Sequence, residues 1–290
     1  MIYEIPTFLK WAGGKQQLLP QFARYFPDKI EKHVEPFLGG GATFFYILKY
    51  KNPACARGYD NNADLINVYT QVKLNLNGLI NELKDLEKEH NQSKDPKSYY
   101  YLRRTEFNTI KMKKLRKAAL FIYLNKTCFN GLYRVNSLGD FNVPFNGENK
   151  IKLFETDILE EANELLNKEN VLLEQSDFRK IIFKRDEFIY FDPPYSPKPK
   201  MNGFTKYTNN GFNEEMQKEL ANIFYDLSKS GNKIILSNSF TTFTNQLYSD
   251  PGYNKYRIRA RRLINCDGNG RDKITELLIT ANMSERHRFI

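Results

Sequence analysis

Short apolar runs alternate with longer amphipathic stretches along most of this chain, and this alternation limits the folds that it can adopt. Runs typical of buried strands cover 33–37, 54–59, 171–174, 187–191 and 233–237. Stretches typical of amphipathic helices cover 43–50, 64–88 and 213–228, the last with Asn213 as its expected N-cap. Strands separated by helices form a mostly parallel sheet, because each crossover places a helix against one face. We therefore predict an α/β fold.

Two parts of the chain depart from this rhythm. The runs 253–259 and 274–280 have no helix between them, so we expect an antiparallel pair of strands at one edge of the sheet. The stretch 90–150 is polar and basic, is rich in Tyr and Asn, and shows little strand–helix alternation. We interpret it as a second domain inserted into a larger one, which comprises 1–89 and 151–290.

The charge of the chain favours a polyanionic partner. Lys and Arg number 44 against 34 Asp and Glu among 290 residues, which gives a formal net charge of +10. A positive surface attracts nucleic acid, although a sum over the sequence does not place the charges on one face. One basic cluster fits a phosphate contact and a solvated helix face equally well; it comprises Lys111, Lys113, Lys114, Arg116 and Lys117.

Cysteine usage and hydropathy indicate a cytoplasmic protein. The three cysteines are widely spaced and form neither a disulfide framework nor a zinc-ligand pattern. The N-terminus lacks the charged and apolar regions of a signal peptide, and no apolar run approaches the roughly 20 residues of a membrane span. We find no cluster of metal ligands and expect no metal.

A glycine-rich segment, EPFLGGG at 35–41, follows the first apolar run and precedes a helical one. Glycines in this position let a backbone approach a nucleotide closely, although Phe44 replaces the third glycine of a dinucleotide fingerprint. Asp60 ends the next apolar run, 19 residues after Gly41, where a carboxylate can accept hydrogen bonds from ribose hydroxyls. This pair of features indicates an adenosine-containing cofactor, either NAD or S-adenosylmethionine.

The tetrad DPPY at 192–195 favours S-adenosylmethionine. It ends the apolar run 188–191, at the edge of the sheet where open α/β folds bind their ligands. An aromatic amine that attacks a sulfonium methyl group must lose a proton, and the Asp192 carboxylate and the Pro193 carbonyl can accept its two hydrogens. Tyr195 offers a face on which a base rotated out of a duplex can stack. These residues predict methyl transfer to a planar amine.

Several blocks in one order resemble the Dam family of alpha-class DNA adenine methyltransferases over nearly the whole chain. The blocks are FLKWAGGK at 8–15, 35–41, Asp60, FNGLYRVN at 129–136, FNVP at 141–144, SDF at 176–178 and 192–195. The resemblance implies the Rossmann-like fold of S-adenosylmethionine-dependent methyltransferases, with a seven-strand sheet. It also implies that 90–150 is a small, mainly helical DNA-recognition domain that carries a β-hairpin.

The resemblance also assigns roles to individual residues. It implies catalytic roles for Asp192, Pro193 and Tyr195. Cofactor contacts fall on Trp11, Lys15, Phe37, Gly39, Gly41, Asp60, Asp177 and Asp192. DNA contacts fall on Lys10, Asn130, Leu132, Arg134, Pro144 and, in a loop that orders on DNA, Arg262. The implied site is GATC, although 145–148 (FNGE) differs from relatives, which carry a glycine, an arginine and a tyrosine there.

The expected protein is therefore a monomer that methylates the 6-amino group of adenine in duplex DNA, near the nucleoid of a bacterium or archaeon or during phage infection. Genome context decides whether a restriction endonuclease acts on the same site; we expect no stable complex with one. The alternatives left open are a silent DNA-binding protein of the same fold, a methyltransferase for RNA or a protein amide, and a nicotinamide-dependent oxidoreductase. The last explains neither the tetrad nor the charge.

Overall fold

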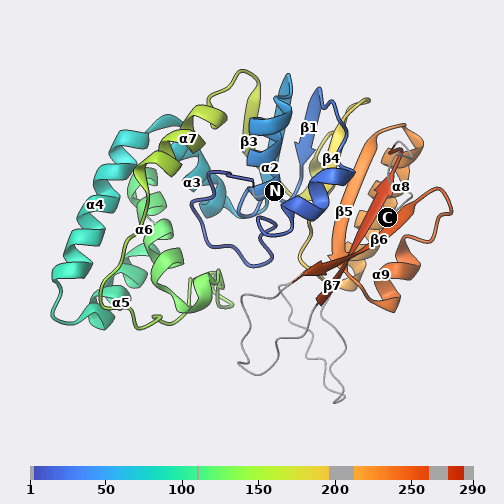
Figure 1. The fold of residues 1–290 in the computed structure, drawn as a ribbon. Coiled ribbons are helices and arrows are strands. Elements are labelled where there is room, and N and C mark those ends of the chain that lie inside the picture. Colours follow the sequence, from blue (N-terminus) through green and yellow to red (C-terminus); the bar gives the residue numbers. More distant parts are fainter. Residues whose placement is uncertain (1–2, 110, 196–211, 261–273, 284–290) are drawn as a thin grey trace, which may run out of the picture.

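The computed structural model describes residues 3–109, 111–195, 212–260 and 274–283, and its centre is a seven-stranded sheet (Figure 1). The strand order is β3-β2-β1-β4-β5-β7-β6. The strands are β1 (Lys32–Glu35), β2 (Cys55–Asp60), β3 (Val171–Gln175), β4 (Phe188–Phe191), β5 (Lys233–Ser239), β6 (Asn254–Ala260) and β7 (Ile274–Ala281). Every strand that the sequence predicts is present, within two residues of its predicted ends.

The pairing of the strands also follows the prediction. Strands β1 to β5 run parallel, with β1 between β2 and β4, whereas β7 is antiparallel to both β5 and β6. All four residues of β4 are buried, and successive side chains enter two different apolar clusters. Phe188 and Tyr190 join one cluster and Ile189 and Phe191 the other, so the sheet is covered on both faces. The α/β prediction is confirmed.

Two helices connect the sheet much as predicted. Helix α2 (Ala42–Tyr46) continues as a π-helical turn, Ile47–Lys51, over the segment predicted as 43–50. Helix α8 (Glu214–Lys229) begins after Asn213, whose side chain accepts a hydrogen bond from the Met216 N–H at 2.9 Å. The shorter helices are α1 (Leu19–Phe22), α9 (Thr242–Leu247) and the 3₁₀ turns η1 (Ala23–Tyr25), η3 (Phe129–Gly131) and η4 (Phe178–Lys180).

The single helix predicted over 64–88 is wrong in one respect, because the chain breaks there into α3 (Ala63–Leu74) and α4 (Leu76–Gln92). Asn75 leaves the helical region with φ −138° and ψ 39°. Its side-chain amide donates to Gln71 Oε1 at 2.8 Å, and such a local side-chain bond stabilises a helix end. Hydropathy continues across the break, so its periodicity did not reveal the break.

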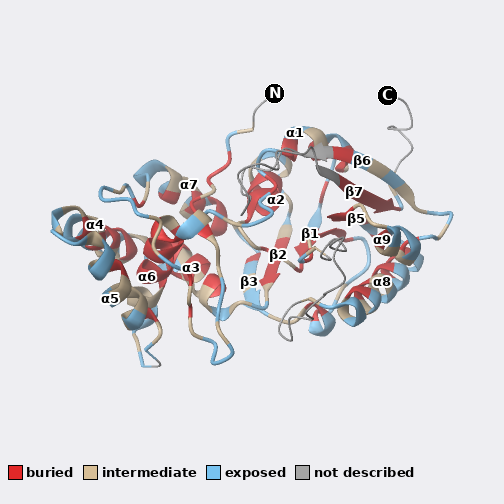
Figure 2. Ribbon diagram, turned by 90° about the horizontal axis from the view of Figure 1, so that it is seen from below, coloured by how far each residue is buried: buried red, intermediate tan, exposed pale blue. Residues whose placement is uncertain are grey.

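Helices α4, α5 (Pro96–Phe107) and α6 (Lys114–Thr127) form a group at one end of the molecule, with α3 and α7 (Thr156–Leu166) between them and the sheet (Figure 1). The core of this group is α6, in which nine residues are buried, whereas α4 and α5 expose much of their outer surface (Figure 2). The predicted boundary at residue 90 falls within the last turn of α4. A separate inserted domain stays a prediction.

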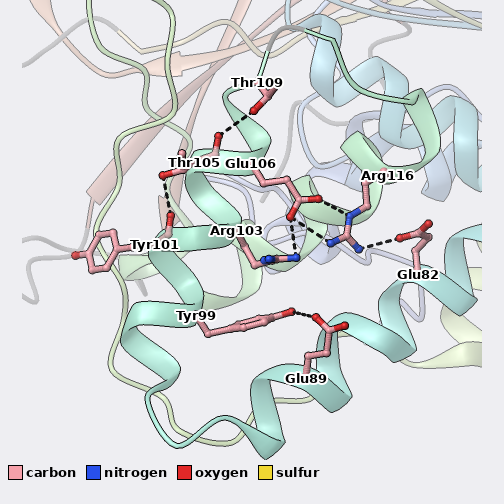
Figure 3. Close-up of polar contacts among 9 residues, drawn as sticks. All are labelled: Glu82, Glu89, Tyr99, Tyr101, Arg103, Thr105, Glu106, Thr109 and Arg116. Carbon is pink, nitrogen blue, oxygen red and sulfur yellow. Dashed lines mark hydrogen bonds and ion pairs between the residues drawn. The ribbon is translucent and has the colours of Figure 1, made fainter.

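Arg116 connects these three helices and decides part of the role of the basic cluster (Figure 3). Its guanidinium donates to Glu106 Oε1 on α5 at 2.8 Å and to Glu82 Oε2 on α4 at 2.9 Å. Lys117 donates to the Phe107 carbonyl at 2.7 Å. These two side chains stabilise helix packing, whereas Lys111, Lys113 and Lys114 are exposed.

Among the described residues, no helix is long and apolar enough to cross a membrane.

Candidate active site

The glycine loop and Asp60 meet at the carboxyl ends of β1 and β2, as predicted. The Gly39 N–H donates to Asp60 Oδ2 at 3.0 Å, and the Asn62 N–H donates to Asp60 Oδ1 at 2.9 Å. Burial raises the pKa of the Asp60 carboxyl, and these backbone donors oppose the shift. Gly39 has φ +48° and Gly41 has φ +70°, in the left-handed region that favours glycine.

Trp11 lies directly against this loop. A Cβ on Gly39 would stand 2.8 Å from Trp11 Nε1, and one on Gly40 would stand 2.9 Å from Trp11 Cβ. A Cβ on Gly41 would stand 2.7 Å from the Tyr69 hydroxyl. The glycines therefore accommodate the aromatic rings of the protein itself, a reason for them that the sequence pattern did not reveal. Trp11 therefore packs against the loop at Gly39 and Gly40.

Asp192 lies at the end of β4 with partners on both carboxylate oxygens. Lys15 Nζ stands 2.8 Å from Asp192 Oδ2, and the Ser237 hydroxyl donates to Asp192 Oδ1 at 2.9 Å. The Tyr190 hydroxyl lies 3.0 Å from Ser237 Oγ and donates to it, because the Ser237 proton is engaged with Asp192. The Lys15 side chain is 3% exposed, so this ion pair is shielded from water. The ion pair with Lys15 holds the Asp192 carboxylate in one orientation.

The rest of the tetrad is held by residues that the sequence analysis missed. The Tyr195 hydroxyl donates to Glu276 Oε2 on β7 at 2.9 Å, while Lys15 Nζ lies 4.9 Å from the centre of its ring. Burial raises the pKa of Glu276, although Lys15 lowers it. The Pro194 carbonyl accepts a hydrogen bond from Gln217 Nε2 at 3.1 Å.

A buried amide relay supports that last contact. Asn238 Nδ2 donates to Gln217 Oε1 at 3.0 Å, and both side chains are at most 1% exposed. The polar end of β5, Ser237–Asn238–Ser239, was the available sequence signal, because the carboxyl ends of the strands are where open α/β sheets bind their ligands.

His33 and Glu35 form a buried pair behind the loop. Their Nε2 and Oε2 atoms are 3.3 Å apart, and His33 Nδ1 lies 3.1 Å from the Phe188 carbonyl. Burial lowers the pKa of His33 to about 3. Burial and the nearby Asp192 raise the pKa of Glu35 well above its ordinary value, while Lys15 opposes the shift. The directions of both pKa shifts favour the neutral forms, in which His33 Nδ1–H donates to the Phe188 carbonyl and Nε2 accepts from the Glu35 carboxyl.

The remaining predicted cofactor residues lie at the neighbouring strand end. Asp177 follows β3, where the Ser176 N–H donates to the Asp60 carbonyl at 3.1 Å. Asp177 pairs with Arg179, whose Nη2 lies 2.6 Å from Oδ2, and this hydrogen bond lowers the pKa of Asp177. The ring of Phe37 lies 5.4 Å from that of Phe178. Asp60, Asp177 and Phe37 thus lie around one corner of the sheet.

The segment predicted as a recognition hairpin folds back on itself after η3 without forming a named strand, and its role in recognition stays a prediction. Single bridges join Cys128 to Phe145 and Val135 to Phe141. Arg134 is exposed, and its Nε donates to Asn142 Oδ1 at 2.7 Å. The resemblance assigns DNA contacts to four other residues. Asn130, Leu132 and Pro144 lie at the root of the hairpin, and Lys10 lies in the N-terminal segment beside it. Arg262 lies outside the described residues.

The described part of the chain contains no group of three or more His, Cys, Asp or Glu side chains placed to hold a metal ion. A glycine loop after β1, an acidic residue at the end of β2, a DPPY tetrad after β4 and an antiparallel β7 between β5 and β6 are consistent with the fold of S-adenosylmethionine-dependent methyltransferases.

The comparisons with known proteins identify the family. The family model described as D12 class N6 adenine-specific DNA methyltransferase matches residues 11–264. The chain is 40% identical to the Type II methyltransferase M.MjaIII of Methanocaldococcus jannaschii, over 95% of this chain and 99% of that protein. It is 37% identical to the Type II methyltransferase M1.LlaDCHI of Lactococcus lactis, over 94% of each.

A third relative, the DNA adenine methylase of Haemophilus influenzae, is 34% identical over 93% of this chain and 92% of that protein. The chain belongs to the D12 class of N6 adenine-specific DNA methyltransferases. It is an adenine-specific DNA methyltransferase, and the predicted resemblance to the Dam family is confirmed.

Proposed function

We propose that this enzyme transfers a methyl group from S-adenosylmethionine to the 6-amino nitrogen of adenine in duplex DNA, with the 192–195 tetrad as its catalytic loop. The observation that carries the proposal is the position of Asp192, which directly follows β4, the neighbour of β1 in the sheet, and pairs with Lys15 at 2.8 Å. This position supports the proposal, because the ends of adjacent parallel strands are where open α/β folds bind their ligands.

The residues at the strand ends fit that cofactor. Asp60 offers carboxylate oxygens for ribose hydroxyls. Gly39 and Gly41, whose positive φ angles favour glycine, carry no side chain that would keep a nucleotide from the backbone of their loop. Lys15 offers a buried ammonium for the methionine carboxylate, while Trp11 packs against the loop at Gly39 and Gly40. Phe37 and Asp177 stand at the corner assigned to the adenine ring.

When bound, S-adenosylmethionine supplies a methyl group on a positively charged sulfur, so that the amine lone pair forms the C–N bond while the C–S electrons return to sulfur. Asp192 accepts a hydrogen bond from the amino group, which increases the electron density on the attacking nitrogen. Ser237 and Lys15 fix the carboxylate in one orientation. The departing proton leaves along this hydrogen bond, first toward Asp192 and then to solvent.

The carbonyl of Pro193 accepts the second amino hydrogen. Gln217 Nε2 donates a hydrogen bond to the next carbonyl, that of Pro194, at 3.1 Å. This bond fixes the orientation of the backbone next to the Pro193 carbonyl. Two prolines restrict the backbone on either side because their φ angles are nearly constant. The loop is thus organised before the base arrives.

Tyr195 stacks on an adenine that has been rotated out of the duplex. Lys15 lies over one face of the ring at 4.9 Å, so the base stacks on the opposite face. Rotation out of the duplex costs a few kcal/mol, and the stacking and the two hydrogen bonds offset this cost.

We assign sequence recognition to the 90–150 domain, with Arg134 as the side chain that reads a guanine. Its guanidinium is exposed and already oriented by Asn142 at 2.7 Å. An arginine in this setting can donate two parallel hydrogen bonds to guanine O6 and N7. The proposed site is GATC, with Lys10, Asn130, Leu132 and Pro144 as further contacts.

Beyond the reaction, we propose that the enzyme acts as a monomer close to the nucleoid. Two relatives are named Type II methyltransferases, which favours a role in restriction–modification. A restriction endonuclease would then act on the same site without a stable complex.

Transfer of labelled methyl groups from S-adenosylmethionine to an unmethylated duplex tests the reaction. We expect label in adenine with DNA, and none with RNA or protein acceptors. Label only in RNA or protein would replace the proposed substrate. Bound cofactor without transfer to any acceptor would indicate a silent binding protein.

A further inference from the structure

Three asparagines in the helical group each bind the backbone of another residue through both atoms of the side-chain amide, and for one of them that residue lies in a segment outside the group. Asn91 in α4 exchanges two hydrogen bonds with the backbone of Ile151, at 2.8 and 2.9 Å. Asn108, after α5, does the same with Phe141 at 3.0 and 3.1 Å. Asn125, in the last turn of α6, instead binds the N-terminal segment at Lys10, 115 residues away.

The Asn125 amide is 3% exposed and uses most of its hydrogen-bonding capacity. Its Oδ1 accepts from the Lys10 N–H at 2.8 Å, and its Nδ2 donates to the Lys10 carbonyl at 2.7 Å. The same Nδ2 donates to the Gly131 carbonyl at 3.2 Å. One buried side chain therefore joins the N-terminal segment to the root of the recognition hairpin.

Gly131 allows these two segments to touch. A Cβ on Gly131 would stand 2.6 Å from Lys10 Cβ, and its φ of +61° lies in the left-handed region. Lys10 therefore packs directly on the hairpin root, in a position that a larger residue at 131 would prevent. This contact and the Asn125 amide fix the same register between the two segments.

Trp11, the residue after Lys10, contacts both the hairpin and the cofactor loop. The Trp11 ring stands 6.2 Å from the ring of Tyr133, in the hairpin, at an interplanar angle of 25°. The same indole lies against the cofactor loop at Gly39 and Gly40. The N-terminal segment passes between the helical group and the sheet (Figure 1). A shift of Lys10 and Trp11 in either direction would therefore be felt at both sites.

We propose that Asn125 is a positioning residue that couples cofactor binding to DNA recognition, by holding Lys10 and Trp11 in register with the hairpin at Gly131. This inference rests on the proposed function, which assigns Lys10 to DNA and Trp11 to the cofactor. The physical basis is contiguous: a buried amide, a direct backbone contact and a shared aromatic ring connect the two sites. Coupling of this kind must be reciprocal between the two ligands.

The test compares Asn125→Asp with the matched variant Asn91→Asp in the full chain. Each aspartate keeps the acceptor for a backbone N–H and loses the amide donor, which serves one backbone carbonyl at Asn91 and two at Asn125. The affinity for a duplex that contains one unmethylated GATC is measured with and without saturating S-adenosylhomocysteine. Emission from Trp11, the one tryptophan in the sequence, reports binding at the shared contact.

For the wild type and for Asn91→Asp, we expect S-adenosylhomocysteine to tighten DNA binding by about fivefold or more. For Asn125→Asp, we expect this ratio to fall below about twofold, with cofactor affinity alone within about threefold of wild type. The DNA-induced change in Trp11 emission should also decrease. A wild-type ratio in Asn125→Asp, or equal losses in both variants, would overturn the proposal.

Two controls separate other causes. Gly131→Ala disturbs the same contact without changing Asn125, so it should also reduce the ratio; full coupling in that variant would contradict the proposal. A wild-type enzyme without any ratio would contradict it too, even if no variant folded. If methyl transfer to adenine failed while the ratio persisted, the proposed reaction would be wrong and the coupling would stand.

Discussion

Lys15 Nζ lies 2.8 Å from Asp192 Oδ2, and it joins the N-terminal segment to the 192–195 tetrad across 177 positions of the sequence (192 − 15). The lysine side chain is 3% exposed and that of the aspartate is 17% exposed. Removing one partner of such a shielded pair leaves the other charge without compensation, at a cost of roughly 3 to 5 kcal/mol. Substitution of Lys15 leaves an unpaired carboxylate, and substitution of Asp192 leaves an unpaired ammonium, so the two substitutions are expected to have different effects.

Asp192→Asn should abolish most methyl transfer while it preserves DNA binding. The amide keeps the shape of the side chain but loses the negative charge that accepts the amino hydrogen. We expect the rate of transfer under saturating cofactor to fall by about 10² to 10⁴-fold. Rapid-quench measurement with labelled cofactor gives the rate, and electrophoretic mobility gives DNA affinity. Turnover near the wild-type rate would contradict the catalytic role.

Arg134→Ala should relax discrimination at one base pair by about 1 to 3 kcal/mol. Competition between duplexes that differ at single positions measures this loss. Arg103→Ala serves as the control, because Arg103 pairs with Glu106 within the helical group and leaves the hairpin unchanged (Figure 3). If both variants showed the wild-type preference at every position, another side chain would have to read the guanine.

Gly39→Ala should weaken cofactor binding and lower stability, whereas Gly139→Ala should lower stability alone. Both glycines have positive φ, at +48° and +88°, and both substitutions strain the backbone by about 1 to 2 kcal/mol. A Cβ on Gly39 also meets Trp11 at 2.8 Å, which adds about 1 to 3 kcal/mol, but nothing lies within 4 Å of a Cβ on Gly139. Calorimetry with S-adenosylhomocysteine and thermal unfolding measure the two effects. Equal unfolding losses would refute the Trp11 contact.

Glu35→Gln should stabilise the protein increasingly as pH rises. Burial raises the folded-state pKa of Glu35, so the stability that its neutral form contributes is complete below the unfolded value near 4.5. That contribution is lost as pH rises toward the folded pKa, and glutamine cannot lose it. We expect equal melting temperatures near pH 4 and a higher value for the variant at pH 8, by about 2 to 4 °C for each kcal/mol. A constant difference across this range would contradict the assignment.

The strands were accessible from the sequence because buried parallel strands are continuous apolar runs, whereas their order in the sheet was not predicted. The run 188–191 is one example, and its four residues are all buried. The break at Asn75 was not accessible, since an asparagine also fits inside an amphipathic pattern and its bond to Gln71 is a property of the folded chain. The split of the basic cluster likewise depends on Glu82 and Glu106, which only the tertiary structure brings to Arg116.

The candidate site divides in the same way. Motifs predicted Asp60, Asp192 and the glycine loop, since their chemistry depends on short local patterns at strand ends. Glu276 and Gln217 were missed, because each supports the tetrad from a distant segment and resembles an ordinary polar residue in the sequence. The Asn125 contact with Lys10 spans 115 residues and has no local signature.

The central claim is methylation of adenine at one short DNA sequence, and mapping of modified bases tests it most directly. Purified protein would be incubated with S-adenosylmethionine and plasmid DNA from a host without methylation, and single-molecule sequencing would locate every modified base. We predict N6-methyladenine at GATC with the wild type and none with Asp192→Asn. Another short motif would correct the recognition site alone. Absence of modified adenine, with cofactor shown to be bound, would contradict the claim.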